Sequence, residues 1–424
     1  MKMTKYKLGE LVEVTRGASL SGQFYAEEGK LIRLTLGNFN MNGGGFKENT
    51  SKTDLYFTGT VRDEFILNKG DIITPLTEQS LGLLGTTARI PESGKYIQSQ
   101  DVALVRCKEG LLDPNFCYYL ISSSIVRQQL SAAAQQTKIR HTSPEKIKDC
   151  TVWVPDFYTQ KNIGRILTDI DNKIAINRRI NDNLEAMAKQ LYDYWFVQFD
   201  FPNEEGKPYK SSGGAMVWNE KLKREIPTSF DVKSLSEIIE VKDGTHDSPK
   251  PQDNGYFLLT SKHLTERGLD YASAYKISKE DYESINKRSK VDTNDILFSM
   301  IGTIGNSYFV EETKINFAIK NMALFKTSAK RWFSEYMYLY LSSCDYKHYE
   351  GNSLSGSIQK FVSLRTLRDM PILYHEDIIK VFAKEVRNII TMMVNLRKEN
   401  IELTKQRDEL LPLLMNGQAS VNSD

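Results

Sequence analysis

Two long stretches of the chain place hydrophobic residues at alternating spacings of four and three positions. This spacing is typical of a coiled-coil seam, because it keeps one narrow apolar stripe facing a partner helix. Each stretch covers about 36 residues, so at ~1.5 Å per residue we expect two helices about 54 Å long. The second should end near Pro412 and Gly417. The seam positions are Ile163, Leu167, Ile170, Ile174, Asn177, Asn181, Leu184, Ala188, Leu191 and Trp195, then Ile379, Phe382, Val386, Ile389, Met393, Leu396, Asn400, Leu403, Arg407, Leu410 and Leu414.

Both seams contain asparagine, a polar residue that costs stability at this position but selects one helix register. If the helices pair antiparallel with Ile163 opposite Leu414, Asn177 falls opposite Asn400. We offer a contact between Asn177 and Asn400 as a hypothesis for the register. The alternative is that each asparagine faces solvent without touching the other.

Each long stretch follows a segment of similar sequence, so the second half of the chain repeats the first. The difference between matched position numbers falls only from 227 for Leu8 and Leu235 to 220 for Phe116 and Tyr336, as expected for duplicated domains that differ by loop insertions. Short β-branched runs, brief helices and glycine-rich turns in each copy are typical of an α+β domain of roughly 150 residues. The matched segments are 8–14 with 235–241, 70–73 with 294–297, 100–105 with 320–325, and 116–123 with 336–343.

These patterns predict an α+β chain with a pseudo-twofold internal repeat, in which two similar domains are joined by two long helices that form an antiparallel coiled coil. A chain of 424 residues normally exceeds one domain. Turn-forming and polar residues between the halves predict an exposed connector. We place the first domain at 1–155, the central helix at 156–200, the connector at 201–228, the second domain at 229–373, the C-terminal helix at 374–416 and the tail at 417–424.

Composition narrows the function classes only slightly. With 40% hydrophobic and 26% charged residues the chain should fold, and a net charge of +2 means that any nucleic-acid surface must be local. No apolar run reaches the ~18 residues of a membrane span, and the first residues lack a signal-peptide core, so we expect a cytoplasmic protein. The cysteines lack C-x-x-C spacing and are expected to be reduced: Cys107, Cys117, Cys150 and Cys344.

The sequence lacks the signatures of the enzymes that act on DNA or ATP. It has neither a P-loop nor the Pro-Pro dipeptide expected in an adenine methyltransferase motif. Glu28-Gly29-Lys30 and Glu205-Gly206-Lys207 resemble part of a metal-nuclease motif but lack an acidic partner in an upstream strand. His246 beside Asp247 comes with no nucleophile. We therefore expect no catalytic residue, no metal and no cofactor in this chain.

The order of domain, helix, connector, domain and helix resembles the specificity subunit of type I restriction-modification enzymes over nearly the whole chain. Its most specific parts are the helix end Leu191–Phe196, the connector Phe201–Gly214 and the terminal segment Arg407–Gly417. The resemblance implies that each domain reads one half of a split, asymmetric DNA site, while the helices set the gap between the halves.

The resemblance also implies partners. Two methyltransferase subunits, which bind S-adenosylmethionine, would dock on the pseudo-twofold repeat, with two motor-nuclease restriction subunits in a full restriction complex. The competing hypothesis is a duplicated scaffold that assembles proteins through its coiled coil without binding DNA. It would be favoured if the complex lacked sequence-specific, salt-dependent DNA binding.

Loops at matched places in the two copies are the candidate DNA-reading sites, because base readout needs donors and acceptors and phosphate contacts need Lys, Arg or hydroxyls. The loop pairs are 137–143 with 357–363, 15–19 with 243–250, and 85–89 with 302–306, with Asn38 and Lys262–His263 as further candidates. The alternative for each loop, and for the basic run 287–290, is a solvated turn or face. The candidates are Arg16, Ser19, Thr86, Thr87, Arg89, Lys138, Arg140, His141, Thr245, His246, Lys250, Lys262, Thr303, Asn306, Ser357, Gln359 and Lys360.

Overall fold

The computed structural model describes residues 1–40, 44–78, 82–133, 140–265, 268–302, 304–353 and 361–420. Contacts divide the chain into unit 1, which comprises Met1–Ala175 with Ile401–Asp424, and unit 2, which comprises Ile176–Asn400. Each unit therefore contains one copy of the repeat and one end of each long helix.

Both predicted long helices are present. Helix α5 spans Phe157–Tyr192 and continues as a π-helical turn, Asp193–Val197, while helix α11 spans Glu376–Met415. Every predicted seam position is buried or half-buried. Between residues 178 and 187, by contrast, every residue outside the seam is exposed. Pro412 lies in the last turn of α11, and Gly417 follows it with a φ of 70°. The predicted seams are confirmed.

Within unit 2 the two helices run antiparallel. The rings of Tyr192 and Phe382 lie 6.1 Å apart, and further along Asn177 Nδ2 donates to Glu399 Oε2 at 2.7 Å. The hydrogen-bond partner of Asn177 is thus the residue before Asn400, rather than Asn400 itself. Among the described residues, the side-chain oxygens of both asparagines are buried without a hydrogen-bond partner. A direct contact between the two asparagines stays a prediction.

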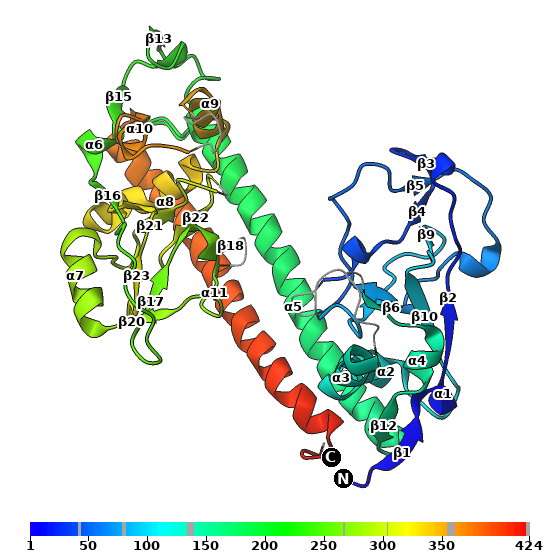
Figure 1. The fold of residues 1–424 in the computed structure, drawn as a ribbon. Coiled ribbons are helices and arrows are strands. Elements are labelled where there is room, and N and C mark those ends of the chain that lie inside the picture. Colours follow the sequence, from blue (N-terminus) through cyan, green and yellow to red (C-terminus); the bar gives the residue numbers. More distant parts are fainter. Residues whose placement is uncertain are drawn as a thin grey trace. The chain divides into compact units, whose positions relative to one another are not determined.

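Unit 1 contains two four-stranded sheets (Figure 1). Its elements are β1 (Thr4–Lys7), α1 (Leu8–Leu11), β2 (Val12–Arg16), η1 (Gly22–Phe24), β3 (Tyr25–Ala26), β4 (Leu31–Arg33), η2 (Leu36–Asn38), β5 (Tyr56–Phe57), η3 (Asp63–Phe65), β6 (Ile72–Pro75), β7 (Thr77–Glu78), β8 (Ala88–Arg89), β9 (Tyr96–Ile97), β10 (Val102–Cys107), α2 (Pro114–Ser122), α3 (Ser124–Ala133), β11 (Arg140–His141), α4 (Pro144–Lys148) and β12 (Thr151–Val154). The central sheet is antiparallel with the order β2-β10-β6-β8. The other sheet, β3-β5-β4-β9, includes the parallel pair β4–β9.

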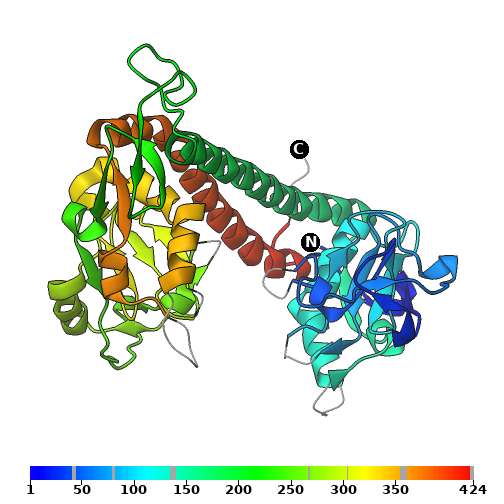
Figure 2. The same ribbon diagram turned by 90° about the horizontal axis from the view of Figure 1, so that it is seen from above.

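Unit 2 repeats this plan from Asp231 on, and a hairpin at 216–227 lies within the predicted connector 201–228. Its elements are β13 (Met216–Asn219), β14 (Arg224–Pro227), β15 (Asp231–Ser234), α6 (Leu235–Ile238), β16 (Val241–Asp243), β17 (Tyr256–Leu259), η5 (Ser261–His263), β18 (Leu264–Thr265), β19 (Gly268–Leu269), β20 (Lys276–Ile277), α7 (Lys279–Ser289), β21 (Ile296–Phe298), β22 (Ser307–Phe309), β23 (Phe317–Ile319), β24 (Ala323–Phe325), η6 (Thr327–Lys330), α8 (Arg331–Tyr340), α9 (Cys344–Ser353), α10 (Leu364–Arg368) and β25 (Pro371–Tyr374). The central sheet has the order β16-β24-β21-β22. The β13–β14 hairpin projects from the rest of unit 2 (Figures 1 and 2).

The two central sheets share their strand register as well as their strand order. Val105 lies opposite Val14 in unit 1, and Phe325 lies opposite Val241 in unit 2. These are the residues that the sequence repeat pairs, and the third strand of each sheet agrees. The predicted fold, two similar α+β domains in a pseudo-twofold repeat joined by two long helices, is confirmed.

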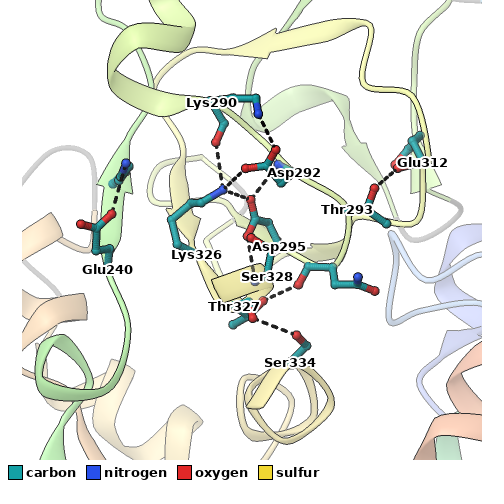
Figure 3. Close-up of polar contacts among 12 residues, drawn as sticks. Glu240, Lys290, Asp292, Thr293, Asp295, Glu312, Lys326, Thr327, Ser328 and Ser334 are labelled. Carbon is teal, nitrogen blue, oxygen red and sulfur yellow. Dashed lines mark hydrogen bonds and ion pairs between the residues drawn. The ribbon is translucent and has the colours of Figure 1, made fainter. Parts of the chain in front are cut away.

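A repeated turn precedes the third strand of each sheet. Asp71 and its counterpart Asp295 each accept a hydrogen bond at 2.8 Å from the backbone N–H three residues earlier. The residue before each has positive φ, 91° at Gly70 and 72° at Asn294. The two turns differ in burial. Asp71 is half-buried, whereas Asp295 is fully buried and lies 2.5 Å from Lys326 Nζ (Figure 3). A buried carboxylate of this kind needs its cation, because desolvation of an unpaired charge is costly.

Apolar packing fixes each domain on its own helix ends. In unit 2 the Phe196 ring lies 4.8 Å from Tyr336 and 4.9 Å from Phe382. In unit 1 Leu167 of α5 and Leu414 of α11 belong to one buried cluster with the domain. Burial of such side chains contributes about 1.5–3 kcal/mol each, so each domain is attached to its helix ends as part of a single core.

Candidate nucleic-acid interface

In unit 1 a buried ion pair closes the base of the predicted reading loop. Strands β7 and β11 pair with Glu78 opposite Arg140 and Thr77 opposite His141. Glu78 is 2% exposed, and its Oε1 lies 3.1 Å from Arg140 Nη1. Its Oε2 accepts the backbone N–H groups of residues 82–84 at 2.9–3.1 Å. Arg140 also donates to Ser131 Oγ at 3.1 Å. The pair thus ties three backbone segments together.

Among the candidates of unit 1 that the structure describes, Arg16, Ser19 and His141 have exposed side chains. Arg16 ends β2, and Ser19 follows it after Gly17. A Cβ on Gly17 would lie 2.2 Å from the carbonyl oxygen of Gln98, so only glycine allows this close backbone approach. The chain is thereby forced to present Arg16 and Ser19 at one defined place on the surface.

Thr86, Thr87 and Arg89 are mostly engaged within unit 1. Thr86 and Thr87 are 3% and 1% exposed, and Thr87 Oγ1 donates to the carbonyl oxygen of Tyr118 at 3.0 Å. The Arg89 guanidinium lies over the Tyr118 ring, 4.8 Å from its centroid. Both threonines line a cavity of about 120 Å³. Their part in DNA binding stays a prediction, but their present contacts stabilise the fold.

The same cavity is lined by a polar cluster that joins α2 to the long helices. Asp171 of α5 accepts hydrogen bonds from Tyr119 Oη at 2.7 Å and from Arg407 Nη1 of α11 at 2.9 Å. Burial, together with the negative charge of Asp171, raises the pKa of the Tyr119 hydroxyl well above its usual range. Tyr119 therefore stays protonated and donates to Asp171, which fixes α2 on the helix pair within unit 1.

The structure corrects one pairing of loops. We paired 85–89 with 302–306, but the strands that follow set a different register. Ala88 lies opposite Ile73, whereas Tyr308 lies opposite Leu297, the counterpart of Ile73. The true partner of each residue in 85–89 therefore lies three positions later than we predicted, so that 85 matches 305 rather than 302. The matched glycines, all at positive φ, are Gly82 with Gly302 and Gly85 with Gly305.

In unit 2 the loop after β16 is held by hydrogen bonds on both sides of His246. Its Nδ1 lies 2.8 Å from Asn321 Oδ1, and its Nε2 lies 2.9 Å from Asp243 Oδ2. Thr245 is 7% exposed, and its Oγ1 accepts the backbone N–H two residues later at 3.1 Å. His246 and Lys250 are exposed. Both ring nitrogens of His246 are thus engaged within unit 2, and no nucleophile faces the ring among its described contacts, so this arrangement does not indicate a catalytic base.

The remaining candidates of unit 2 differ in exposure. Lys262 is exposed, while Asn306 is half-buried and donates to the carbonyl oxygen of Leu264 at 3.2 Å. Asn38 and its counterpart His263 are buried caps of short helices, each accepting the backbone N–H three residues earlier. Burial lowers the pKa of His263, which agrees with its role as an acceptor. Lys138, Thr303, Ser357, Gln359 and Lys360 lie outside the described residues.

The basic run 287–290 is partly neutralised. Lys290 Nζ lies 2.9 Å from Asp292 Oδ1 (Figure 3), Arg288 lies 3.7 Å from Asp243, and Ser289 is buried. Glu205 and Lys207 of the connector pair with each other at 2.9 Å. Within the described ranges, no group of three His, Cys, Asp or Glu side chains could hold a metal ion, and no helix is long and apolar enough to cross a membrane.

Comparison with known proteins identifies the family that the first part of the chain matches. The sequence profile of the family described as "Type I restriction modification DNA specificity domain" matches residues 1–186. Residues 1–186 belong to that family. The resemblance predicted from the sequence is thereby confirmed.

Relatives and one solved structure extend the type I similarity across the chain. The MjaIX specificity subunit of Methanocaldococcus jannaschii is 23% identical over 329 residues, which cover 74% of this chain and 71% of the relative. The HindI specificity subunit of Haemophilus influenzae is 22% identical over 387 residues, covering 76% and 81%. The crystal structure of the type I restriction-modification S subunit from M. genitalium matches 98% of this chain and 96% of its own, with 16% identity and a TM-score of 0.57. That structure shows the same fold.

The type I family accounts for the general function. Specificity for a DNA sequence is inherent to it, and its specificity subunits are non-catalytic, with catalysis in the methyltransferase and restriction subunits. The expectation that this chain is not itself an enzyme agrees with the family that residues 1–186 match.

Sequence reasoning missed three residues at the bases of the candidate loops. Glu78 was not a candidate, although it anchors Arg140, and neither Ile301 nor Phe361 was proposed. Ile301 and Phe361 form a β-bridge at the position where unit 1 pairs Thr77 with His141. Extending the repeat alignment by a few residues would have found all three.

Proposed function

We propose that this chain is the DNA-sequence-recognition subunit of a type I restriction-modification complex and reads a bipartite, asymmetric site. The domain in unit 1 reads one half-site and the domain in unit 2 reads the other. The two long helices set the unspecified gap between the half-sites, because two rigid readers on one spacer must meet major-groove faces at a fixed separation.

The observation that carries this proposal is a shared scaffold with unlike loops. Both domains have the same strand order and the same register, which favours the same mode of docking on DNA. Their loop bases differ in chemistry, with Glu78 and Arg140 in one domain and Ile301 and Phe361 in the other. Similar docking with different contacts is what two unlike half-sites require.

DNA contacts fall to the exposed candidates. Among the described residues these are Arg16, Ser19 and His141 in unit 1, and His246, Lys250 and Lys262 in unit 2. The lysines and arginine suit phosphates, whereas the histidines and serine can also reach base edges. Buried candidates such as Thr87 support the loops that carry these side chains.

The long helices also offer partner surfaces. Ile176, Ile180 and Met187 are exposed along one side of α5, at helical spacings of four and seven, and Met392 and Ile401 are exposed on α11. We propose that two methyltransferase subunits, which carry S-adenosylmethionine, dock along the pseudo-twofold helix pair, joined by two restriction subunits in a full complex. This chain itself holds no cofactor and acts in the cytoplasm, where its DNA is.

A domain exchange tests the proposal. Residues 1–155 are replaced by those of a relative with a different target, and the chain is expressed with its methyltransferase for methylome sequencing. One half-site should change, while the other half-site and the gap remain. An unchanged methylated motif would contradict the assignment, and exchange of residues 229–373 is the matched control for the second half-site.

A further inference from the structure

The two domains place different side chains at one equivalent surface position. In unit 1, His141 lies opposite Thr77, and in unit 2, Phe361 lies opposite Ile301. The hydrogen bonds beside these bridges also match, since the backbone N–H after His141 and the one after Phe361 donate at 2.8 and 3.0 Å to the carbonyl before Thr77 and before Ile301. Ser143 and Ser363 then cap matching helices. The two positions are therefore equivalent within their own units.

The chemistry at this position changes from polar to apolar. In unit 1 it comprises exposed His141 beside the buried pair of Glu78 and Arg140. In unit 2, Ile301 and Phe361 are 37% and 39% exposed and face each other across the bridge. Glu78 follows Thr77 in unit 1, whereas Gly302 follows Ile301 in unit 2, so the chain supplies no carboxylate directly after this bridge position.

This apolar pair stands out in its own domain. Within the described part of 229–373, Ile301 and Phe361 are the large hydrophobic side chains that are exposed. Two scattered exposed apolar residues would need no explanation, but these two are adjacent. Ile301 directly precedes the segment 302–306, and Phe361 lies within the segment 357–363; both segments carry DNA-reading candidates of this domain.

We propose that Ile301 and Phe361 determine specificity in the second half-site by packing against the 5-methyl group of a thymine in the major groove. This rests on the proposed function. The thymine methyl is the apolar group that a base pair presents in the major groove, and Phe is among the side chains that contact it. The equivalent His141 reads a hydrogen-bonding base edge in the first half-site, so one scaffold position serves two kinds of readout.

Thymine-to-deoxyuridine substitution tests this directly, because it removes only the methyl group. The full chain in complex with its methyltransferase is titrated with duplexes that carry its methylated motif, with each thymine of the second half-site replaced singly by deoxyuridine. One replacement should weaken binding about fourfold, the value of one buried methyl group. The F361A variant should bind the thymine duplex more weakly and should lose the difference between thymine and deoxyuridine at that position.

The equivalent variant H141A is the matched control. It should change binding through the first half-site and keep the thymine-to-deoxyuridine difference in the second. A second half-site without any A·T pair, deoxyuridine without effect at every position, or an undiminished difference in F361A would each overturn the inference. Loss of complex assembly in F361A, measured by size-exclusion chromatography, would instead assign the pair to a protein partner and overturn it too. Absence of any sequence-specific binding by the unaltered complex would refute the proposed function instead.

Discussion

The repeated domains of unit 1 and unit 2 share one scaffold and stabilise it differently. In unit 1 the buried anchor is Glu78, at the base of a reading loop, where it holds backbone N–H groups and Arg140. In unit 2 one buried carboxylate is Asp295, in the turn before β21, where Lys326 neutralises it. The two domains therefore keep the same strand register although their buried ion pairs lie at different places in the scaffold.

The largest effect should come from removing the cation of unit 2. In K326M, Asp295 remains buried without its ion-pair partner, so the free energy of unfolding of unit 2 should fall by about 3 kcal/mol. Arg106 occupies the equivalent position in unit 1 and is exposed, so R106M should change stability by less than about 0.5 kcal/mol. Urea unfolding with hydrogen exchange of β21 and β6 measures both. Equal losses in the two variants would refute the asymmetry.

A smaller and more local effect is expected from E78A. Three backbone N–H groups and Arg140 lose their acceptor, so the reading loop of unit 1 should loosen and affinity for the cognate duplex should fall about tenfold, or 1.4 kcal/mol. Competition with duplexes altered in one half-site should show the loss in discrimination of the first half-site. The exposed Glu64 provides the control, and E64A should bind as the unaltered chain does. Equal loss of discrimination in both half-sites would count against a local anchor.

The smallest expected change in stability concerns a contact that each domain makes with a tyrosine ring of a helix, Tyr118 in α2 and Tyr338 in α8. Arg89 stacks on Tyr118 in unit 1, while its counterpart Phe309 packs edge-to-face on Tyr338 with centroids 5.6 Å apart. R89A should therefore cost about 1 kcal/mol, and R89F should restore most of that loss. Thermal unfolding compares the two variants. If R89F is less stable than R89A, the two ring contacts are not interchangeable.

Periodic features were predictable from the sequence, and side-chain partners were not. The two seams and the repeat rest on many residues at regular spacings, so single exceptions do not disturb them. The partner of Asn177 depends on one rotamer, and Glu399 reaches it from the turn that carries Asn400. The loop pairing of 85–89 failed because strand register, rather than the nearest Gly-Thr match, sets equivalence.

The reading residues were the hardest to predict, because they depend on pairing between distant segments. Glu78 meets Arg140, and Ile301 meets Phe361, across about 60 residues of chain in each domain. Composition gives no sign of such pairs. Only the repeat alignment, extended into β7 and β11, brings them together.

Methylome sequencing of a host that expresses this chain with its methyltransferase tests the central claim most directly. The account predicts one motif of two unlike half-sites separated by a gap of unspecified bases. A continuous motif, two identical half-sites or an unmodified genome would contradict the reading of a split site by two different domains.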